Sequence, residues 1–149
     1  MSPAPQRPER VHSDVADRLA RTEQRYTRAR RALVEVLARQ PRPLSVPELV
    51  TAAKLPLSSV YRNLAELERV GAVVRLPSGE EFARYELAED FAGHHHHLLC
   101  TGCGRVFDFT LPPSAEKAMA KASSEIVEAE GFTPSGHRVE LYGQCRECV

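Results

Sequence analysis

The first half of the chain carries apolar residues at helical spacing, interrupted by prolines. Between residues 14 and 39 these residues gather near one face, and the stretch predicts one long helix. That face consists of Tyr26, Leu33, Val34, Val36 and Leu37. Pro41 and Pro43 end the helix, because proline lacks a backbone donor and clashes with the preceding turn. Residues 1–12 contain three prolines and few apolar residues, and they predict a mobile tail.

Two shorter helices are expected next. Ser45 and Glu48 have the spacing of a capping box, which predicts a helix over about 46–53. A third helix is predicted over 58–70, and Gly71 is well placed to end it in a left-handed conformation. The buried stripe of this third helix is Val60, Leu64 and Leu67.

Short β-like runs then alternate with turn signals. Runs at 72–76 and 82–87 flank the Pro-Ser-Gly turn at 77–79. Three helices followed by a β-hairpin make a winged helix-turn-helix. The predicted units of this α+β chain are a tail over 1–12, a winged-helix domain over 13–87, a hinge over 88–93 and a small α/β domain over 94–149.

The last of these units has a pattern of its own. Strands are predicted over 94–100 and 105–109, on either side of a tight turn. Pro112 and Pro113 open a helix of about 113–130, which Gly131 ends. A final strand over about 137–142 leads into the end of the chain.

Charge separates the two halves. The net charge is zero, but residues 1–75 hold 14 Lys and Arg against 8 Asp and Glu, whereas residues 76–149 hold 6 against 12. A basic half can neutralise phosphates, and an acidic half can supply carboxylates to metal ions. No apolar run approaches the roughly 18 residues of a membrane span, and no apolar signal core follows the N-terminus. We therefore expect a cytoplasmic protein without a membrane partner.

All four cysteines lie in the acidic half, as two CxxC pairs: Cys100 with Cys103, and Cys145 with Cys148. Two such pairs can complete a closed tetrahedral site, and this favours structural Zn²⁺ over disulfides, redox chemistry or an iron–sulfur cluster. The interval between the pairs must fold as strand, helix and strand. The metal would then staple the end of the chain to its sheet.

Four consecutive histidines precede the first pair. In a strand His95 and His97 point one way, and His94 and His96 the other, and so one run can serve two metal sites. Further ligands are available nearby: Glu86, Glu89, Asp90, Asp108, Glu116 and His137. Imidazole with carboxylate suits zinc, ferrous iron, manganese or nickel without selecting among them.

Four segments together resemble the ferric uptake regulator superfamily of bacterial metal-sensing repressors. They are residues 26–30 with 33–37, the Ser-Val-Tyr-Arg-Asn-Leu run at 59–64, residues 94–104, and residues 142–148. They cover most of the chain in the family's order. The resemblance implies a homodimer with an N-terminal winged helix and a C-terminal α/β dimerisation domain.

The resemblance also implies three metal sites. The four cysteines match the structural zinc site. The regulatory site at the hinge would use His95, His97 and Asp108, with Glu86 or Glu89. A further site in the dimerisation domain would use His94, His96, Glu116 and His137. The chain lacks the histidine that iron and peroxide sensors often place before the second helix and the cysteine that zinc sensors tend to use. Its histidine run and C-terminal Cys-Arg-Glu-Cys resemble zinc sensors, whereas residues 107–109 resemble the iron group, so the expected regulatory ion is Zn²⁺ or Fe²⁺.

These features predict a metal-dependent repressor of metal-homeostasis genes that binds palindromic double-stranded operator DNA. Arg62 can make bidentate contacts to guanine and Tyr61 can pack on a thymine methyl, while Ser58 and Ser59 can bind phosphate at a helix N-terminus. Phosphate or minor-groove contacts are expected from the first long helix, through Arg25, Arg28, Arg30 and Arg31.

Two other classes compete with the repressor. A zinc enzyme needs an open metal position and a general acid or base, and a nucleobase deaminase needs His-x-Glu with Pro-Cys-x-x-Cys. Neither cysteine pair follows a proline and no His-x-Glu occurs, so we expect no enzyme and no small organic substrate. A metal-storage or interaction module that never touches DNA is the alternative, and the basic helix-turn-helix argues against it.

Overall fold

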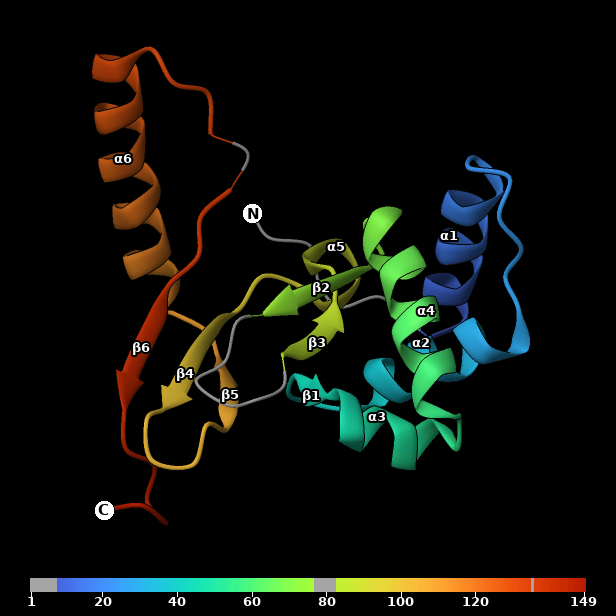
Figure 1. Cartoon of the computed structure of the whole chain (residues 1–149). Coiled ribbons are helices and arrows are strands. Elements are labelled where there is room, and N and C mark those ends of the chain that lie inside the picture. Colours follow the sequence, from blue (N-terminus) through green and yellow to red (C-terminus); the bar gives the residue numbers. More distant parts are fainter. Residues whose placement is uncertain (1–7, 77–82, 135) are drawn as a thin grey trace.

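The computed structural model describes residues 8–76, 83–134 and 136–149 of the chain. It has a helical half that ends in a small sheet, and a second half in which another sheet carries one long helix (Figure 1). Together these halves confirm the predicted α+β class.

The helical half contains α1 (Pro8–Ala20), α2 (Arg28–Arg39), α3 (Val46–Ala53) and α4 (Leu57–Arg69). The predicted capping box is present, because the Ser45 amide donates to a Glu48 carboxylate oxygen at 2.7 Å. Gly71 follows α4 with φ of +70°, as expected for a left-handed helix stop.

The prediction of one long helix over 14–39 was wrong. The chain leaves α1 after Ala20 and starts α2 at Arg28, with Glu23 at φ of +57° in the connection. Thr27 caps α2, since its hydroxyl accepts from the Arg30 amide. The predicted tail over 1–12 also extends too far, because α1 begins at Pro8 and buries Val11.

Three short strands complete this half: β1 (Leu44–Ser45), β2 (Val73–Leu76) and β3 (Arg84–Leu87). They form an antiparallel sheet in the order β1-β3-β2. Helices followed by this hairpin give the predicted winged helix-turn-helix. The turn expected at 77–79 and the start of the second strand at residue 82 lie outside the described residues.

The hydrophobic core belongs to this half. It runs from Val11 in α1 to Phe91, and its centre is formed by side chains with no more than 1% exposure. These include Val15, Leu19, Leu33, Val34, Val46, Leu49, Val60, Leu64 and Leu67. The stripe predicted for the third helix is therefore the face on which α4 packs.

The second half contains β4 (His96–Cys100), β5 (Val106–Phe109), α6 (Pro113–Glu130) and β6 (Glu140–Gly143). The sheet order is β5-β4-β6, with β4 antiparallel to β5 and parallel to β6. The parallel pair sets Cys100 opposite Gly143. This register brings the end of the chain back beside the first cysteine pair.

The predicted hinge over 88–93 contains a short helix, α5 (Glu89–Ala92). Phe91 is 2% exposed and belongs to the winged-helix core. Asp90 pairs with Arg18 of α1, and the Arg18 guanidinium lies 4.4 Å from the centre of the Phe91 ring. The connection is thus anchored to the helical half before the chain enters β4.

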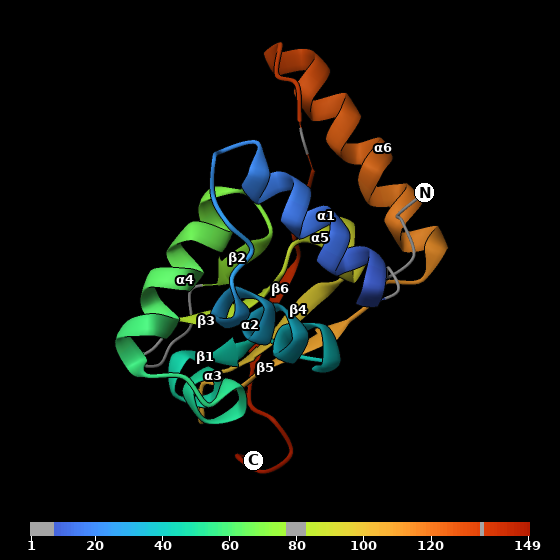
Figure 2. The same cartoon turned by 90° about the vertical axis from the view of Figure 1, so that its right-hand side faces the viewer.

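Helix α6 extends away from both sheets (Figures 1 and 2). Among the described residues none of its side chains is buried, and Ile126 is 65% exposed. Phe132, Leu141 and Tyr142, which follow α6 in the chain, are exposed as well. None of the described helices combines the length and the apolar character that crossing a membrane requires.

Candidate metal centres and nucleic-acid interface

The four cysteines meet at one end of the C-terminal sheet. Cys100 ends β4 and Cys103 lies in the turn after it, while Cys145 and Cys148 follow β6. One sulfur from each residue lies within 4.8 Å of the others, and the Cys103 and Cys145 sulfurs are 3.8 Å apart. Tetrahedral Zn–S bonds of about 2.3 Å separate two sulfurs by about 3.8 Å. The donor set therefore fits zinc.

The two CxxC turns approach each other closely. A Cβ atom on Gly102 would lie 2.9 Å from Cys148 Cβ, so a side chain at this position would push the turns apart. The amides of Cys145 and Cys103 donate to the Cys100 sulfur at 3.2 and 3.5 Å. These two hydrogen bonds lower the pKa of Cys100 to about 6, which favours the thiolate that a metal needs.

A second cluster joins the two halves of the molecule. Glu86 of β3 places one carboxylate oxygen 3.1 Å from Nε2 of His95 and 3.1 Å from Nε2 of His97. Asp108 of β5 approaches the same nitrogens at 4.0 and 3.9 Å. The pairing of His97 with Asp108 across β4 and β5 sets this geometry. Four ligand atoms, one from each residue, lie within 4.8 Å of one another.

The electrostatics of this cluster follow from its burial and its mixed charges. The hydrogen bond that His95 donates to Glu86 raises the pKa of His95 to about 9, against the effect of burial. Burial raises the pKa of Asp108 to about 6. Burial also acts to raise the pKa of Glu86, but hydrogen bonds with His95 and His97 outweigh it and lower that pKa. The cluster thus holds protons that a cation can displace.

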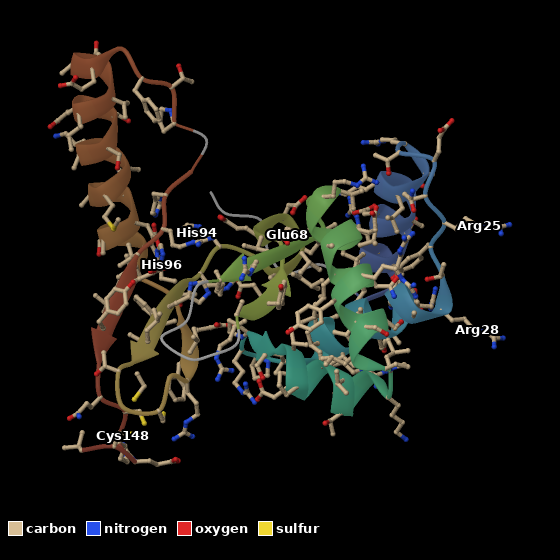
Figure 3. All side chains as sticks on the ribbon, in the orientation of Figure 1. Arg25, Arg28, Glu68, His94, His96 and Cys148 are labelled. Carbon is tan, nitrogen blue, oxygen red and sulfur yellow. The ribbon has the colours of Figure 1, made fainter. Side chains whose placement is uncertain are left out.

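A third cluster lies on the other side of β4. His96 Nε2 lies 2.7 Å from Glu116 of α6, and His137 Nε2 lies 3.1 Å from the same carboxylate. His94 Nε2 is 3.2 Å from His137 Nε2 and 3.3 Å from Glu116. His94 and His96 are seen together beside the root of α6 (Figure 3). Alternating histidines on one strand therefore serve two separate groups, as their period of two predicts.

Glu89 does not join the Glu86 cluster, which corrects the expectation that it could act there. It begins α5, and its carboxylate contacts Nδ1 of His94. The docking of Phe91 in the helical core turns α5 so that Glu89 faces the third cluster. From the sequence alone, Glu86 and Glu89 were equally good candidates for the carboxylate ligand of the hinge site.

Helix α4 presents the candidate DNA-reading residues. Ser58, Tyr61 and Arg62 are exposed, with Tyr61 at 45%. Ser59 is half-buried and accepts a hydrogen bond from the buried Asn63 amide at 3.2 Å. Its hydroxyl is therefore already engaged within the helix.

The sequence reading missed Leu57, the first residue of α4, which is 53% exposed. An exposed leucine one turn before Tyr61 adds apolar surface to the same end of the helix. The predicted helix began at residue 58, so Leu57 was not considered as part of it. Placement at the very start of the helix leaves it outside the core.

The arginines of the N-terminal helices divide into two groups. Arg25 and Arg28 are exposed and point away from the fold (Figure 3), and Arg31 is exposed too. Arg30 is 8% exposed, and its guanidinium donates to the Arg25 carbonyl and to Gln24. The expectation that Arg30 contacts DNA was therefore wrong. It lies one turn before Leu33 on the buried face of α2, where it holds the α1–α2 connection.

Comparison with known proteins gives a consistent result. A profile of the ferric uptake regulator family matches residues 21–142. The ferric uptake regulation protein of Bordetella parapertussis is 36% identical over 95 residues, a match that spans 64% of this chain and 63% of that protein. The peroxide operon regulator of Bacillus subtilis is 29% identical over 140 residues, covering 91% of each.

Solved structures show the same fold. The Helicobacter pylori ferric uptake regulator superposes with a TM-score of 0.78 at 23% identity, covering 98% of this chain and 96% of that one. The Vibrio cholerae ferric uptake regulator gives 0.68 at 28% identity, covering 85% and 96%. A zinc-bound manganese uptake regulator gives 0.63 at 26% identity, covering 91% and 98%.

Proposed function

Because this chain belongs to the ferric uptake regulator family of transcription regulators, which are not enzymes, we propose that it is a metal-dependent repressor. In this proposal a homodimer binds palindromic operator DNA in the cytoplasm when a regulatory Zn²⁺ or Fe²⁺ ion is bound. The genes it controls would serve metal homeostasis.

The observation that carries the proposal is the position of Glu86. It lies on β3 of the winged-helix sheet and shares a cluster with His95, His97 and Asp108 of the C-terminal unit. An ion held there ties the DNA-binding half to the other half. Such an ion strengthens DNA binding only if it binds the DNA-competent arrangement more tightly than other arrangements.

A cavity of about 690 Å³ lies against this cluster, between the two halves. Gln40, Pro41 and Arg42, which follow α2, line it together with Glu86, His95 and Asp108. Space at this junction allows the winged helix to change its angle. This arrangement supports the regulatory role that we propose for the Glu86 cluster. Glu86 belongs to the winged-helix side of the cavity, whereas His95 and Asp108 belong to the C-terminal side.

We assign structural zinc to the four cysteines, whose sulfur spacing suits it. The third cluster, of His94, His96, Glu116 and His137, is proposed as a further divalent-metal site. Its ligand from α6 would fix that helix to β4. Solved structures of similar regulators contain iron, zinc or manganese, and the metal titration described below identifies the ion sensed here.

Recognition of DNA is assigned to α4, to the connection before α2 and to the first residue of α2. Arg62 would read guanine, and Tyr61 with Leu57 would pack on thymine methyl groups. Ser58 would bind phosphate at the helix N-terminus, with Arg25 and Arg28 on the flanking backbone. Exposed apolar residues on α6 and β6 would be covered by a second copy of the chain, and a two-fold dimer matches a palindrome.

The main test is DNA binding at buffered free concentrations of Zn²⁺, Fe²⁺, Mn²⁺ and Ni²⁺, on a site first selected from random duplexes. The expected result is a sequence-specific complex that one of these ions strengthens by tenfold or more. Metal binding without any selected site would instead favour the storage or interaction module.

Two variants locate the function. His97→Ala should abolish the metal response and retain one zinc per chain, whereas His137→Ala, a histidine of the third cluster, is the matched control. Arg62→Ala should weaken operator binding sharply and leave metal content unchanged, with Arg146→Ala as a control far from α4. A metal response that survives in His97→Ala would place the regulatory site elsewhere.

A further inference from the structure

One arginine side chain spans both cysteine pairs. Arg105 follows the first CxxC turn, and its Nε donates to the Cys103 sulfur at 3.2 Å. Its Nη2 donates to the Cys145 sulfur at 3.6 Å. The same guanidinium contacts the Glu147 carboxylate inside the second CxxC turn. A single planar group thus contacts Cys103 in the first CxxC turn and both Cys145 and Glu147 in the second.

The donors around the sulfurs are divided in a simple way. The Cys100 sulfur receives backbone amides from Cys145 and Cys103. The Cys103 and Cys145 sulfurs receive the two arms of Arg105. Four thiolates on one Zn²⁺ carry a net charge of −2, and a cation that donates to two of them offsets part of that charge. Arginine suits this role because its donors form a fixed fork.

We propose that Arg105 is an outer-sphere positioning residue of the zinc site, which clamps the two CxxC turns together and slows the loss of the ion. The proposal rests on the assignment of zinc to the four cysteines. Arg105 does not bind the ion. It holds two of the ligands at the spacing that the ion requires, and it lowers the negative charge on their sulfurs.

The surroundings of Arg105 favour a fixed position for its side chain. The Arg105 guanidinium lies 5.7 Å from the centre of the ring of Phe107, which lies two residues further along in β5. Its contact with Glu147 draws it towards the end of the chain. A plain surface ion pair between Arg105 and Glu147 is the competing explanation, and exposed pairs of this kind contribute little. The experiment must therefore separate the sulfur contacts from the carboxylate contact.

The test uses the full chain loaded with one zinc per cysteine site and challenged with a coloured chelator. The His97→Ala, His137→Ala background removes ions from the other clusters, so that the released zinc comes from the cysteines. Arg105→Gln should lower zinc affinity and speed zinc transfer by about tenfold, as removal of outer-sphere partners does elsewhere. Arg146→Gln removes the same charge from the second turn and should match the parent.

Two more variants separate charge from geometry. Arg105→Lys keeps the charge but loses the fork, and its transfer rate should fall between those of the parent and Arg105→Gln. Glu147→Gln should stay near the parent rate. A second readout is alkylation of the zinc-loaded thiolates by iodoacetamide, where a C–S bond forms and iodide leaves. This reaction should be faster in Arg105→Gln, because its sulfurs are more nucleophilic.

The outcomes are distinguishable. Equal zinc loss from Arg105→Gln and Arg146→Gln overturns the role of Arg105 while leaving the zinc site intact. An effect of Glu147→Gln as large as that of Arg105→Gln shows that the ion pair is responsible, and also overturns it. If Cys103→Ser in the same background retains its zinc, the zinc assignment itself fails and the proposal falls with it.

Discussion

The winged helix and the C-terminal unit differ in what fills their interiors. The first has a continuous apolar core from Val11 to Phe91. In the second, the described residues that are buried include His96, His97 and Cys100, with Val106 as an apolar companion. Helix α6 buries no side chain there. We therefore expect the first half to fold on hydrophobic burial, whereas the second has grouped candidate metal ligands where a core would be.

This contrast also separates stability from function. In the winged helix the apolar core stabilises the surface that would face DNA, and we expect this half to assemble without an ion. In the C-terminal unit the three clusters lie on or beside β4, so ions bound there would couple ion binding to folding. The Glu86 cluster is the one that includes a residue from the winged helix. It is therefore the cluster best placed to convert ion binding into a change in the DNA-binding half.

The largest effect is expected from breaking the cysteine site. Cys103→Ser should release one zinc per chain and destabilise the C-terminal sheet by several kcal/mol, because structural zinc contributes on the order of 10 kcal/mol in small domains. Hydrogen exchange measured by mass spectrometry should show lost protection in β4 and β6. Protection in α2 and α4 should persist. Equal loss in α2 would mean that the halves unfold together and that the contrast is wrong.

The second prediction concerns a substitution in the core of the winged helix. Leu33 is fully buried in α2, and Leu33→Ala should cost about 2–5 kcal/mol of winged-helix stability by leaving a cavity. Urea unfolding followed by circular dichroism measures this loss, and zinc content should not change. Leu98→Ala in β4 is the control, since Leu98 is 38% exposed and should cost less than about 1 kcal/mol. Zinc loss from Leu33→Ala would contradict the separation of the two halves.

The two halves also differ in how much the sequence predicts. In the winged helix, the capping box at Ser45, the stripe on α4 and the stop at Gly71 all follow from local chemistry. The break between α1 and α2 does not, because Tyr26 continues the apolar pattern through a segment that is not helical. Thr27 is a good helix cap, and its identity was the available signal for that break.

In the C-terminal unit, ligand grouping was more predictable than packing. The spacing of the cysteines and the alternation of the histidines can be read directly from the sequence. The structure brings those residues into separate groups. Glu89 was misplaced because α5 depends on Phe91 entering a core elsewhere in the chain. Arg30 was misplaced for a different reason, since the helical wheel of α2 buries it beside Leu33. The Glu89 error reflects long-range packing that local pattern does not show, whereas the Arg30 error could have been avoided from its i, i+3 spacing with Leu33.

A smaller effect tests what covers α6. Ile126→Ser should leave winged-helix stability within about 0.5 kcal/mol, because the side chain is 65% exposed in the single chain. If a second copy covers this face, dimer dissociation should become about tenfold easier, which corresponds to about 1.4 kcal/mol. Sedimentation equilibrium gives the dissociation constant, with Ser124→Ala as the neighbouring control. An unchanged constant would show that α6 is not the dimer surface.

The smallest effect concerns acid sensitivity of the winged helix. Burial acts to raise the pKa of Glu48, but hydrogen bonds from Arg42 and Ser45 outweigh it and lower that pKa to about 2. A depressed carboxyl pKa contributes stability that is complete above the ordinary value of 4.5 and is lost as pH falls towards 2. After allowance for a side chain that is one-third exposed, the contribution is roughly 1 kcal/mol.

Glu48→Gln should therefore lower the unfolding free energy at pH 7 by about 1 kcal/mol, and the gap from wild type should narrow to about half by pH 3 and close only as pH falls to 2. Urea unfolding of both proteins at pH 7, 5 and 3 measures the gap, and acid release of metal affects both alike. Glu128→Gln on the exposed face of α6 is the matched carboxylate control. A gap that stays constant with pH would mean that Glu48 stabilises α3 by its shape and hydrogen bonding as a neutral group. The acid sensitivity of the chain would then lie in its metal-binding half alone.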